Sequence, residues 1–455
     1  MTVVVGFLRL GTSEVVTLDR SPRIVVGSDQ GKRLKLPTII PGDDARERGS
    51  ALMKLLTSHK PVRAALDEVL ACPVTDPPQP LYFKVAAKTA DALPWEQLYT
   101  PLHGFCALDR RWPVGRIVGR YHGVPDRAFV PPLRIVALLS AAHVSGVAQL
   151  EGILASLATP EARELGVSLT VISAEPAVLA KAKASKVEGI TTQQMKTDAA
   201  GVAEQITAAE PHILHVLCHG GLSFGLRTLA LATTADFLPG DDDDEFADPG
   251  AVRHDGAAQG GSVLEGSVRL PAPSLAQALE PCNPWLVVLA ACDTAEVADG
   301  PGLAQDLVEA GVPAVIGMRR LVDLTDTDKF SGALYPELIR TVRRVLAARK
   351  GASTREIIDW ASALTAPRVA LSGTDPLLQD TWSDPVLYVQ SDPLRVYWDG
   401  AAKLSPVEFT WLKAQLDMWR AQRSVLDEAS TDPTVLRKID AKIAELAQQL
   451  MASLS

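Results

Sequence analysis

Two short apolar runs, each ending in a residue that can do chemistry, constrain this chain most. In the first stretch, Pro211–Gly221 (PHILHVLCHGG), the apolar run stops at His219. In the second, Pro284–Thr294 (PWLVVLAACDT), it stops at Cys292. Apolar runs of this length, closed by polar residues or glycine, are typical of buried parallel strands. Active sites of open α/β sheets lie just past the carboxyl ends of such strands. The pattern therefore predicts an α/β protein with a site at one sheet edge.

If the two strands are neighbours, His219 and Cys292 lie one strand spacing apart. In a Cys–His dyad the imidazole takes the thiol proton, and the thiolate attacks a carbonyl carbon. The backbone N–H groups of Gly220 and Cys292 are candidate donors to the oxyanion, because glycine lets the backbone approach a substrate closely. A cysteine at the end of an apolar strand is, taken alone, more often a core residue than a nucleophile. Only the joint pattern indicates a hydrolase.

This pair of strand ends resembles those of the caspase-like cysteine peptidases of clan CD, and most of all the bacterial CHAT domain. That family has an apolar strand ending in His-Gly and a later one ending in Ala-Cys-acidic-Thr, as in Leu217–Gly220 and Leu289–Thr294. Three further stretches carry the same resemblance: Ala92–Tyr99 (ALPWEQLY), Pro113–Arg116 (PVGR) and Gly302–Met318 (GLAQDLVEAGVPAVIGM). The resemblance covers about residues 80–395.

The resemblance implies a caspase-like α/β fold, in which helices flank a mostly parallel sheet. The order of the predicted elements agrees, because strands at Leu133–Ser140 and Val167–Ser173 alternate with helices at Val144–Leu157 and Thr197–Glu210. We predict three regions along the chain. They are an N-terminal β-rich, pseudo-caspase-like region leading into the CHAT domain (1–130), a catalytic domain (131–400) and a C-terminal α-helical hairpin (401–455).

The N-terminal region contains several β-like segments and one helical segment, Asp44–Ala71. The β-like segments are Val3–Leu10, Glu14–Leu18, Pro22–Val26 and Pro80–Val85. Trp95 and Tyr99 are four residues apart, so we expect them on one face of a helix. We interpret both as core aromatics and not as catalytic residues.

The C-terminal region repeats apolar residues at helical spacing on two arms. Ser405-Pro406 and Asp432-Pro433 are start signals for the two helices. The stripes contain Phe409, Leu412, Leu416 and Trp419 on one arm, and Leu436, Ile439, Ile443, Leu446 and Leu450 on the other. Either the stripes bury each other and dock on the rest of the chain, or residues 405–455 recruit a regulatory partner or self-associate.

An insertion at residues 239–262 follows the histidine strand and contains the acidic run Asp241–Glu245. Five like charges without apolar periodicity are typical of a solvated loop. The run lacks the ligand spacing of a Ca²⁺ loop. A regulatory segment or a self-cleavage site stays open.

The substrate pocket is predicted from the ends of neighbouring strands. Ser140, the residues beside Cys292 and the stretch after Met318 are its candidate walls. Arg319 or Arg320 would suit an acidic residue before the scissile bond, whereas Asp293 or Asp323 would suit a basic one. Both signs are present, so the specificity stays open.

Composition excludes several classes of function. The net charge of −9 and the lack of a basic stripe argue against a nucleic-acid partner. Five cysteines without a CxxC pair predict neither a disulfide framework nor a metal site, and we expect no cofactor. The chain shows no signal peptide and no apolar stretch long enough to span a membrane, so we expect a cytoplasmic protein.

The resemblance thus implies a cysteine endopeptidase acting on protein substrates. CHAT proteins are commonly linked to bacterial defence or programmed cell death, which implies a protease kept latent until a partner gates it. The alternative is a catalytically weak pseudoprotease that acts as a scaffold or adaptor through its C-terminal helices. The oligomeric state and the trigger stay open.

Overall fold

The computed structural model describes most of the chain. Described are residues 2–10, 13–22, 31–74, 77–86, 88–118, 126–223, 226–237, 266–291, 294–295, 302–320, 324–347, 356–398, 406–426 and 433–452. Three predicted site residues, Cys292, Asp293 and Asp323, lie outside these ranges, as do the insertion at 239–262 and most of the predicted strand at Pro22–Val26.

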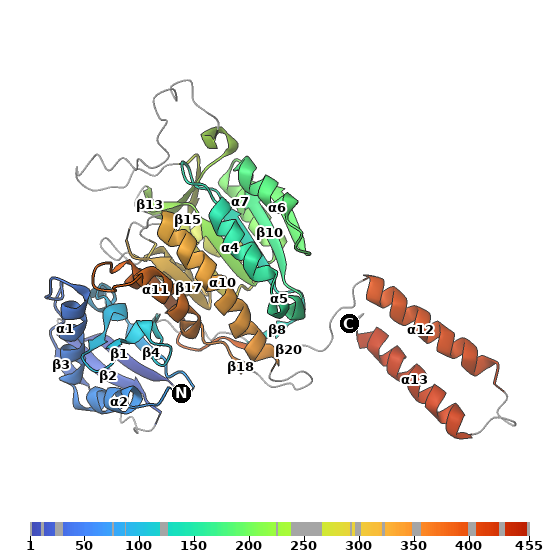
Figure 1. The fold of residues 1–455 in the computed structure, drawn as a ribbon, viewed down its shortest axis with the longest axis horizontal. Coiled ribbons are helices and arrows are strands. Elements are labelled where there is room, and N and C mark those ends of the chain that lie inside the picture. The colour runs from blue at the N-terminus through green and yellow to red at the C-terminus, as the bar shows by residue number, and fades with distance from the viewer. Residues whose placement is uncertain are drawn as a thin grey trace.

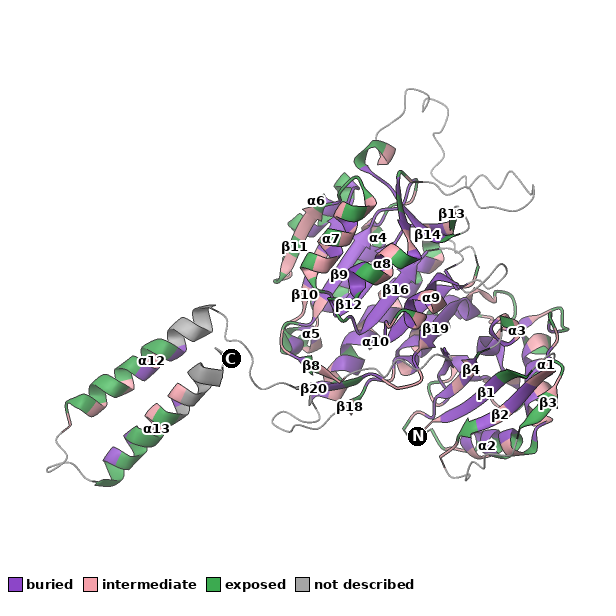
Figure 2. Cartoon of the chain, turned by 180° about the vertical axis from the view of Figure 1, so that it is seen from behind, coloured by how far each residue is buried: buried purple, intermediate pink, exposed green. Residues whose placement is uncertain are grey.

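A twelve-stranded sheet forms the centre of the body (Figures 1 and 2). Its strands, in spatial order, are β11 (Ile190–Gln194), β10 (Ser168–Ser173), β9 (Arg134–Leu139), β12 (Ile213–Leu217), β16 (Leu286–Ala290), β17 (Ala314–Met318), β19 (Pro385–Val389), β7 (Val114–Ile117), β4 (Leu81–Val85), β1 (Val3–Leu10), β2 (Ser13–Arg20) and β3 (Lys32–Leu34). Strands β11 to β17 are parallel, and β19 runs antiparallel to β17. Strands β7, β4 and β1 run parallel to β19. The predicted class, a mostly parallel α/β sheet flanked by helices, is confirmed.

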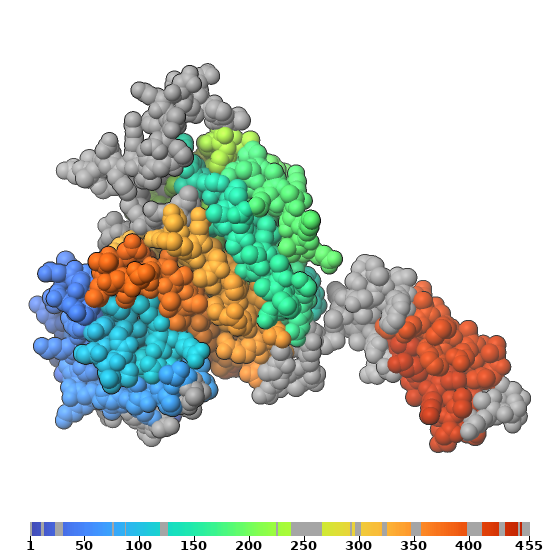
Figure 3. Space-filling view, viewed as in Figure 1, coloured from blue at the N-terminus to red at the C-terminus, as the bar shows by residue number. Residues whose placement is uncertain are grey.

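The strands of the N-terminal region continue this same sheet. Strand β19, from late in the chain, lies between β17 and β7 and so joins the two halves. In Figure 3 the blue and cyan atoms of the N-terminal region lie directly against the orange atoms of later segments. The proposed boundary at residue 130 stays a prediction about domains, but it does not separate two sheets.

Two layers of helices cover the sheet (Figures 1 and 2). One layer contains α4 (Val147–Leu157), α5 (Pro160–Leu165), α10 (Leu324–Ala347) and α11 (Thr365–Ser372), and the other contains α7 (Ala199–Ala209), α8 (Ala272–Leu279) and α9 (Leu303–Glu309). Helix α6 (Pro176–Ala184) packs beside β10 and β11. Buried aliphatic residues of the strands and of both layers form one continuous core.

Shorter elements complete the body. A hairpin of β13 (His219–Ser223) and β14 (Leu226–Leu231) pairs with β15 (Val268–Pro271) in a second sheet. A third sheet contains β18 (Glu356–Ile357), β20 (Arg395–Trp398) and β8 (Arg127–Phe129), and a fourth contains β5 (Tyr99–Thr100) and β6 (Gly104–Phe105). Short helical turns are α3 (Lys88–Asp91), η1 (Trp95–Gln97), η2 (Cys106–Leu108), η3 (Thr234–Phe237), η5 (Ala361–Leu364) and η6 (Thr381–Ser383).

The helical segment expected at 44–71 is in fact two helices, α1 (Ala45–Thr57) and α2 (Lys60–Leu70). Asp44 begins the first helix, because its carboxylate accepts the Glu47 N–H at 2.7 Å. Pro61 lacks an N–H, so a single helix through it would lose a backbone hydrogen bond. The chain therefore starts a new helix with the proline in its first turn.

Trp95 is a core aromatic, as expected, but it does not share a helix face with Tyr99. Its ring is fully buried and stacks between Phe7 and Phe83, with centroids 4.7 Å from each. The helix η1 ends at Gln97, and Tyr99 lies on the short strand β5. Only one turn of helix forms after Pro94, so the expectation that Trp95 and Tyr99 share one helix face was wrong.

The C-terminal hairpin consists of α12 (Pro406–Ser424) and α13 (Pro433–Ala452). Leu412 and Leu416 pack against Leu446 in a small separate core. Arg423 pairs with Asp440 across the hairpin at 2.8 Å. The apolar stripes thus pack against each other, and Figures 1 and 2 show the hairpin apart from the body. No helix in the described part of the chain is long and apolar enough to cross a membrane.

Candidate active site

Strands β12 and β16 are parallel neighbours, and their register aligns the strand residues that precede the two predicted catalytic residues in the sequence. Leu217 pairs with Ala290 at the last position of the two strands. His219 follows Leu217 by two residues, just as Cys292 follows Ala290 by two residues in the sequence. Neighbouring strands lie about 4.8 Å apart. Of the two predicted catalytic residues, only His219 is among those the structure describes.

A hydrogen bond to the backbone fixes the His219 ring. His219 is half-buried at the start of β13, and its Nε2–H donates to the carbonyl oxygen of Ala142 at 2.7 Å. A carbonyl can only accept, so the contact assigns the proton to Nε2. In the neutral ring Nδ1 then carries the lone pair that a general base needs. The contact gives His219 the tautomer and the fixed orientation that a catalytic histidine requires.

The turn that presents this carbonyl contains a strained residue. Ala141 and Val144 form an isolated antiparallel bridge, and His143 between them has a φ of 57°. His143 is the third residue of the four-residue turn 141–144. A positive φ at this position flips the central peptide of the turn relative to the common type I turn, and the oxygen of this peptide is the Ala142 carbonyl. A residue other than glycine in this region costs about 1 kcal/mol. The strain coincides with the group that orients His219, and such strain clusters at functional sites.

A buried carboxylate holds the next part of the same loop. Glu175 accepts the Ser145 hydroxyl at 2.5 Å and the Gly146 N–H at 2.8 Å. Glu175 is 7% exposed and follows strand β10. It thereby links the loop after β9 to the neighbouring strand and limits the movement of the Ala142 turn.

The structure places Ser140, a predicted pocket residue, in the interior. Ser140 is fully buried, and its hydroxyl donates to the Ala232 carbonyl at 2.8 Å and accepts the Ala174 N–H at 3.2 Å. Its own N–H donates to the Leu217 carbonyl at 3.0 Å. These bonds support a role in tying strand ends together and leave no hydroxyl for a substrate. Gly220 is buried opposite Leu229 in the β13–β14 pair, and its role at the oxyanion stays a prediction.

Thr294, from the Cys-Asp-Thr motif, fixes the described residues around the predicted nucleophile. Its hydroxyl donates to the Ala291 carbonyl at 3.0 Å and accepts the Met318 N–H at 2.9 Å. A Cβ on Gly317 would lie 3.0 Å from this hydroxyl oxygen and 2.9 Å from the Ala304 Cβ. Glycine at 317 therefore permits this close approach, and the threonine joins the end of β16 to β17.

The other histidines of the β12 segment are structural. The His212 Nδ1 accepts the Arg134 N–H at 3.0 Å, and His215 bonds the Gln149 Oε1 through Nε2 at 2.8 Å. Burial lowers the pKa of each ring to about 3. Cys218, next to His219 in the sequence, is also buried. In the described ranges, no group of three His, Cys, Asp or Glu residues is placed to hold a metal ion.

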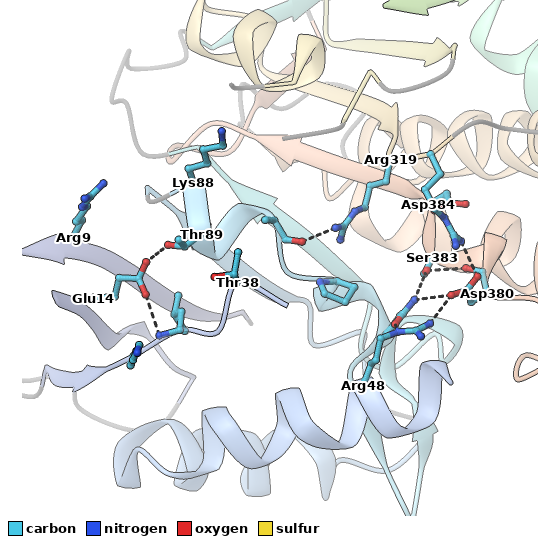
Figure 4. Close-up of a pocket in the computed structure, with 16 residues that line it drawn as sticks. Arg9, Glu14, Thr38, Arg48, Lys88, Thr89, Arg319, Asp380, Ser383 and Asp384 are labelled. Carbon is cyan, nitrogen blue, oxygen red and sulfur yellow. Dashed lines mark hydrogen bonds and ion pairs between the residues drawn. The ribbon is translucent and has the colours of Figure 1, made fainter. Parts of the chain in front are cut away.

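Arg319 and Arg320, both predicted pocket residues, follow β17. Arg319 contacts the N-terminal region, and Arg320 contacts the 380–384 segment. Figure 4 shows Arg319 beside Asp384. The Arg319 Nη2 donates to the Ala92 carbonyl at 2.6 Å. Arg320 bonds Asp384 at 2.6 Å and Asp380 at 2.8 Å. Burial raises the pKa of Asp384 to about 6, although Arg320 opposes the shift. In this structure both arginines have protein partners.

A buried ion pair explains two of the sequence stretches that carry the family resemblance. Glu96 belongs to ALPWEQLY and Arg116 to PVGR, and the Arg116 guanidinium bonds both Glu96 oxygens, at 3.0 and 2.6 Å. Asp91 lies 2.8 Å from the same guanidinium and accepts the Tyr388 hydroxyl at 3.0 Å. Burial disfavours ionisation of Glu96, but the charge of Arg116 outweighs it and lowers the Glu96 pKa. These motif residues therefore stabilise the sheet and do not take part in chemistry.

These elements define an α/β protein with a caspase-like arrangement, in which a fixed histidine ends one strand beside the strand that leads to a cysteine. The chain belongs to the CHAT domain family, which matches residues 50–365. The family and the parallel sheet support a caspase-like peptidase fold.

Comparisons with other proteins add little beyond the family. No curated protein matches the chain. Two solved structures of the Saccharomyces cerevisiae separase–securin complex are similar to it, at 14% and 11% identity. They match 76% and 82% of this chain, which spans only 17% and 21% of theirs, and both TM-scores are 0.33. TM-scores this low do not support conclusions about the function of this chain.

Proposed function

We propose that this protein is a caspase-like cysteine endopeptidase in which His219 and Cys292 form the catalytic dyad. The hydrogen bond from His219 to the Ala142 carbonyl carries the proposal, because it leaves Nδ1 as the base. The parallel register of β12 and β16 supports the pairing with Cys292, since the two residues follow paired positions. Membership of the CHAT family supports the same chemistry.

The proposed reaction is peptide-bond hydrolysis in two stages. The His219 Nδ1 accepts the Cys292 thiol proton, and the thiolate attacks the scissile carbonyl carbon to give a tetrahedral oxyanion. Backbone N–H groups of Gly220 and Cys292 donate to this oxyanion. The C–N bond then breaks, the amine leaves with the proton from His219, and an acyl-enzyme remains. Water attacks the thioester, with His219 as base, and releases the acid.

Ala142 has a backbone role in this scheme. When His219 takes up the proton, the ring carries a positive charge, and the Ala142 oxygen stabilises that charge through the existing hydrogen bond. A backbone carbonyl thus takes the orienting place that a third side chain occupies in a triad.

We propose that a partner gates the enzyme in bacterial defence or programmed cell death. Residues 405–455 are the proposed contact for a regulatory protein or a second copy of the chain. Its α-hairpin, with its own small core, supports an interaction module. A cytoplasmic setting would keep the thiol reduced.

The substrate pocket is proposed at the end of β17, near Arg319 and Arg320, with Asp293 and Asp323 as residues of opposite charge. Because both arginines already pair with protein groups, we assign no preference for an acidic or basic residue before the cut.

A comparison of new protein N-termini tests the proposal. Wild type, Cys292→Ala and His219→Ala are added to host-cell lysate, with Cys282→Ala as a control that changes another cysteine. We expect cuts with wild type and the control, and a loss of about a thousandfold or more in the other two. The residues before the cuts reveal the specificity.

A latent enzyme could give no cuts, so the same variants are labelled with a thiol-reactive acyl-enzyme mimic, before and after deletion of residues 405–455. Labelling of Cys292 that depends on His219 supports the dyad. Equal cleavage by wild type and Cys292→Ala, or equal labelling of Cys292 with and without His219, overturns it and favours the scaffold alternative.

A further inference from the structure

A cavity of about 350 Å³ lies between the strands of the N-terminal region and the end of α10. This volume is at the lower end of the range for small-molecule sites. Residues of β1, β2, β4, β7 and β19 contribute to its lining, and so do the segments 357–362 and 390–394. Helix α10 packs beside β18 and β20 in this part of the body (Figure 1). Pro313, just before β17, also lines the cavity, which therefore lies at the opposite end of this strand from Arg319 and the proposed substrate pocket.

The strand register places three of the lining side chains on one face of the sheet. Val4 on β1 pairs with Arg20 on β2 and with Tyr82 on β4. Paired residues of neighbouring strands point to the same face, where their side chains are neighbours. The apolar Val4 therefore lies between a cation and an aromatic ring, and all three line the cavity. This face offers both an apolar surface and a positive charge to a ligand.

Most of the residues that line the cavity are apolar, and they include Val4, Ile117, Ile358, Val389 and Leu394. Val4 and Ile117 are buried, at 4% and 8% exposed, yet among the described residues neither belongs to the continuous core. An apolar side chain that faces a void loses the dispersion contacts that a filled core would give it. A hydrocarbon group bound in the cavity would supply these contacts, so the walls favour a ligand with an apolar body.

Three charged residues line the cavity: two arginines, Arg20 and Arg344, and one carboxylate, Asp359. Asp359 accepts the Tyr82 hydroxyl at 2.8 Å and the Ser362 hydroxyl at 2.7 Å. Both arginines are exposed, and in the part of the chain that the structure describes neither side chain forms an ion pair or a hydrogen bond. Asp359 is thus held by groups of its own wall, whereas both guanidinium groups are available to a ligand. The lining has one positive charge in excess.

We propose that this cavity binds an organic monoanion with a hydrocarbon chain, of the class of the medium-chain fatty carboxylates. The chain lies against the apolar walls, and the carboxylate bonds the guanidinium groups of Arg20 and Arg344. Guanidinium groups bind carboxylate oxygens with two parallel hydrogen bonds, and one carboxylate neutralises the excess charge of the lining. The ligand would join the N-terminal strands to α10. The site is separate from the His219 strand end and does not depend on the proposed peptidase activity.

Calorimetric titration of the full-length protein tests the proposal, with octanoate, decanoate and uncharged 1-decanol as probes, each below its aggregation or solubility limit. We expect saturable binding of decanoate at one site. Decanoate should bind about tenfold more tightly than octanoate, because two further methylene groups leave water. Arg20→Glu and Arg344→Glu each reverse one cation of the lining and should weaken decanoate binding about tenfold or more. Binding of 1-decanol should not change in these variants, because it has no charge.

Arg33→Glu is the matched control. Arg33 is an exposed cation on β3 that does not line the cavity, and it pairs with Val15, five residues before Arg20 on β2. Thermal unfolding of each variant verifies that it folds. Unchanged decanoate binding to Arg33→Glu, with weakened binding to the other two variants, supports the site. The proposal is overturned if wild type shows no saturable binding of decanoate, if all three reversals weaken it equally, or if octanoate and decanoate bind equally tightly.

Discussion

The ends of β12 and β17 lie on the same edge of the sheet, about 10 Å apart if each strand spacing is about 4.8 Å, yet different forces build them. At the β12 end, a neutral backbone hydrogen bond to Ala142 fixes His219. At the β17 end, the Arg319 guanidinium donates to the Ala92 carbonyl, and Arg320 forms ion pairs with Asp380 and Asp384.

The β12 end is therefore preorganised, whereas the contacts at the β17 end can change with salt and with bound ions. Backbone hydrogen bonds between neutral groups depend little on salt, so the His219 ring keeps one orientation before any substrate arrives. Partly exposed ion pairs weaken with salt and exchange partners with incoming ions. The β12 end thus suits the chemical step that we propose for His219, and the charged groups of the β17 end suit the substrate pocket that we propose there.

The largest expected effect lies behind the β17 end, at the buried pair of Glu96 and Arg116. Arg116→Met leaves Glu96 and Asp91 buried without their main cation, and we expect a loss of about 3–5 kcal/mol of unfolding free energy. Denaturant unfolding at neutral pH measures it. Arg340→Met removes an exposed pair with Glu337 and should cost less than about 1 kcal/mol. Equal losses in the two variants would contradict the assignment.

Acid should lower the free energy of unfolding through His215 on β12, because the imidazole of this buried residue must stay neutral in the folded state. Burial lowers its folded pKa to about 3, whereas an unfolded histidine titrates near 6.5. The unfolded state therefore binds more protons between these values, so stability is full above about pH 6.5 and falls as pH falls. At pH 5 we expect about 2 kcal/mol lost through this residue.

Unfolding curves of wild type and His215→Asn at pH 7 and pH 5 measure this effect. The variant should be less stable at pH 7 but lose about 2 kcal/mol less on acidification. An unchanged slope in His215→Asn would show that other groups cause the acid sensitivity.

The apolar periodicity was enough to predict much of the fold. Long apolar runs such as Leu133–Ser140 and Pro284–Ala290 become buried strands wherever they occur, so the parallel half of the sheet followed from the sequence. The heptad-like stripes likewise predicted the C-terminal hairpin. The sequence also predicts a helix over Ile357–Leu364, and this prediction is wrong in part, because Glu356–Ile357 pairs as strand β18 and only η5 is helical.

What the sequence did not reveal depends on contacts without a residue signature. The Ala142 carbonyl belongs to a residue that carries no chemistry in its side chain, so only the structure connects it with His219. The pairing of Glu96 with Arg116 joins residues twenty positions apart whose elements show no periodicity. Arg319 and Arg320 were expected to face a substrate, but their contacts with Ala92 and Asp384 depend on how the N-terminal strands extend the sheet.

A smaller effect is expected from Glu175, which braces the Ala142 turn. Glu175→Gln removes one of the two carboxylate oxygens that accept Ser145 and Gly146, so the carbonyl should hold His219 less well. We expect about a tenfold lower kcat with little change in KM, because positioning and not binding is affected. Faster amide exchange at 141–146 is the readout that does not need activity. Glu161→Gln, in the first turn of α5, is the matched control.

The smallest expected effect lies at the exposed side of the β17 end. Arg320 is about half exposed (49%), and Asp380 keeps Arg48 as a partner when Arg320 is removed. A double-mutant cycle of Arg320→Gln and Asp380→Asn should therefore give a coupling of about 0.5 kcal/mol that falls as salt is added. The cycle is measured by denaturant unfolding at two ionic strengths. A coupling energy above about 2 kcal/mol that does not change with ionic strength would contradict this view. Only an ion pair shielded from solvent ions behaves in that way, so the β17 end would then be as rigid as the β12 end.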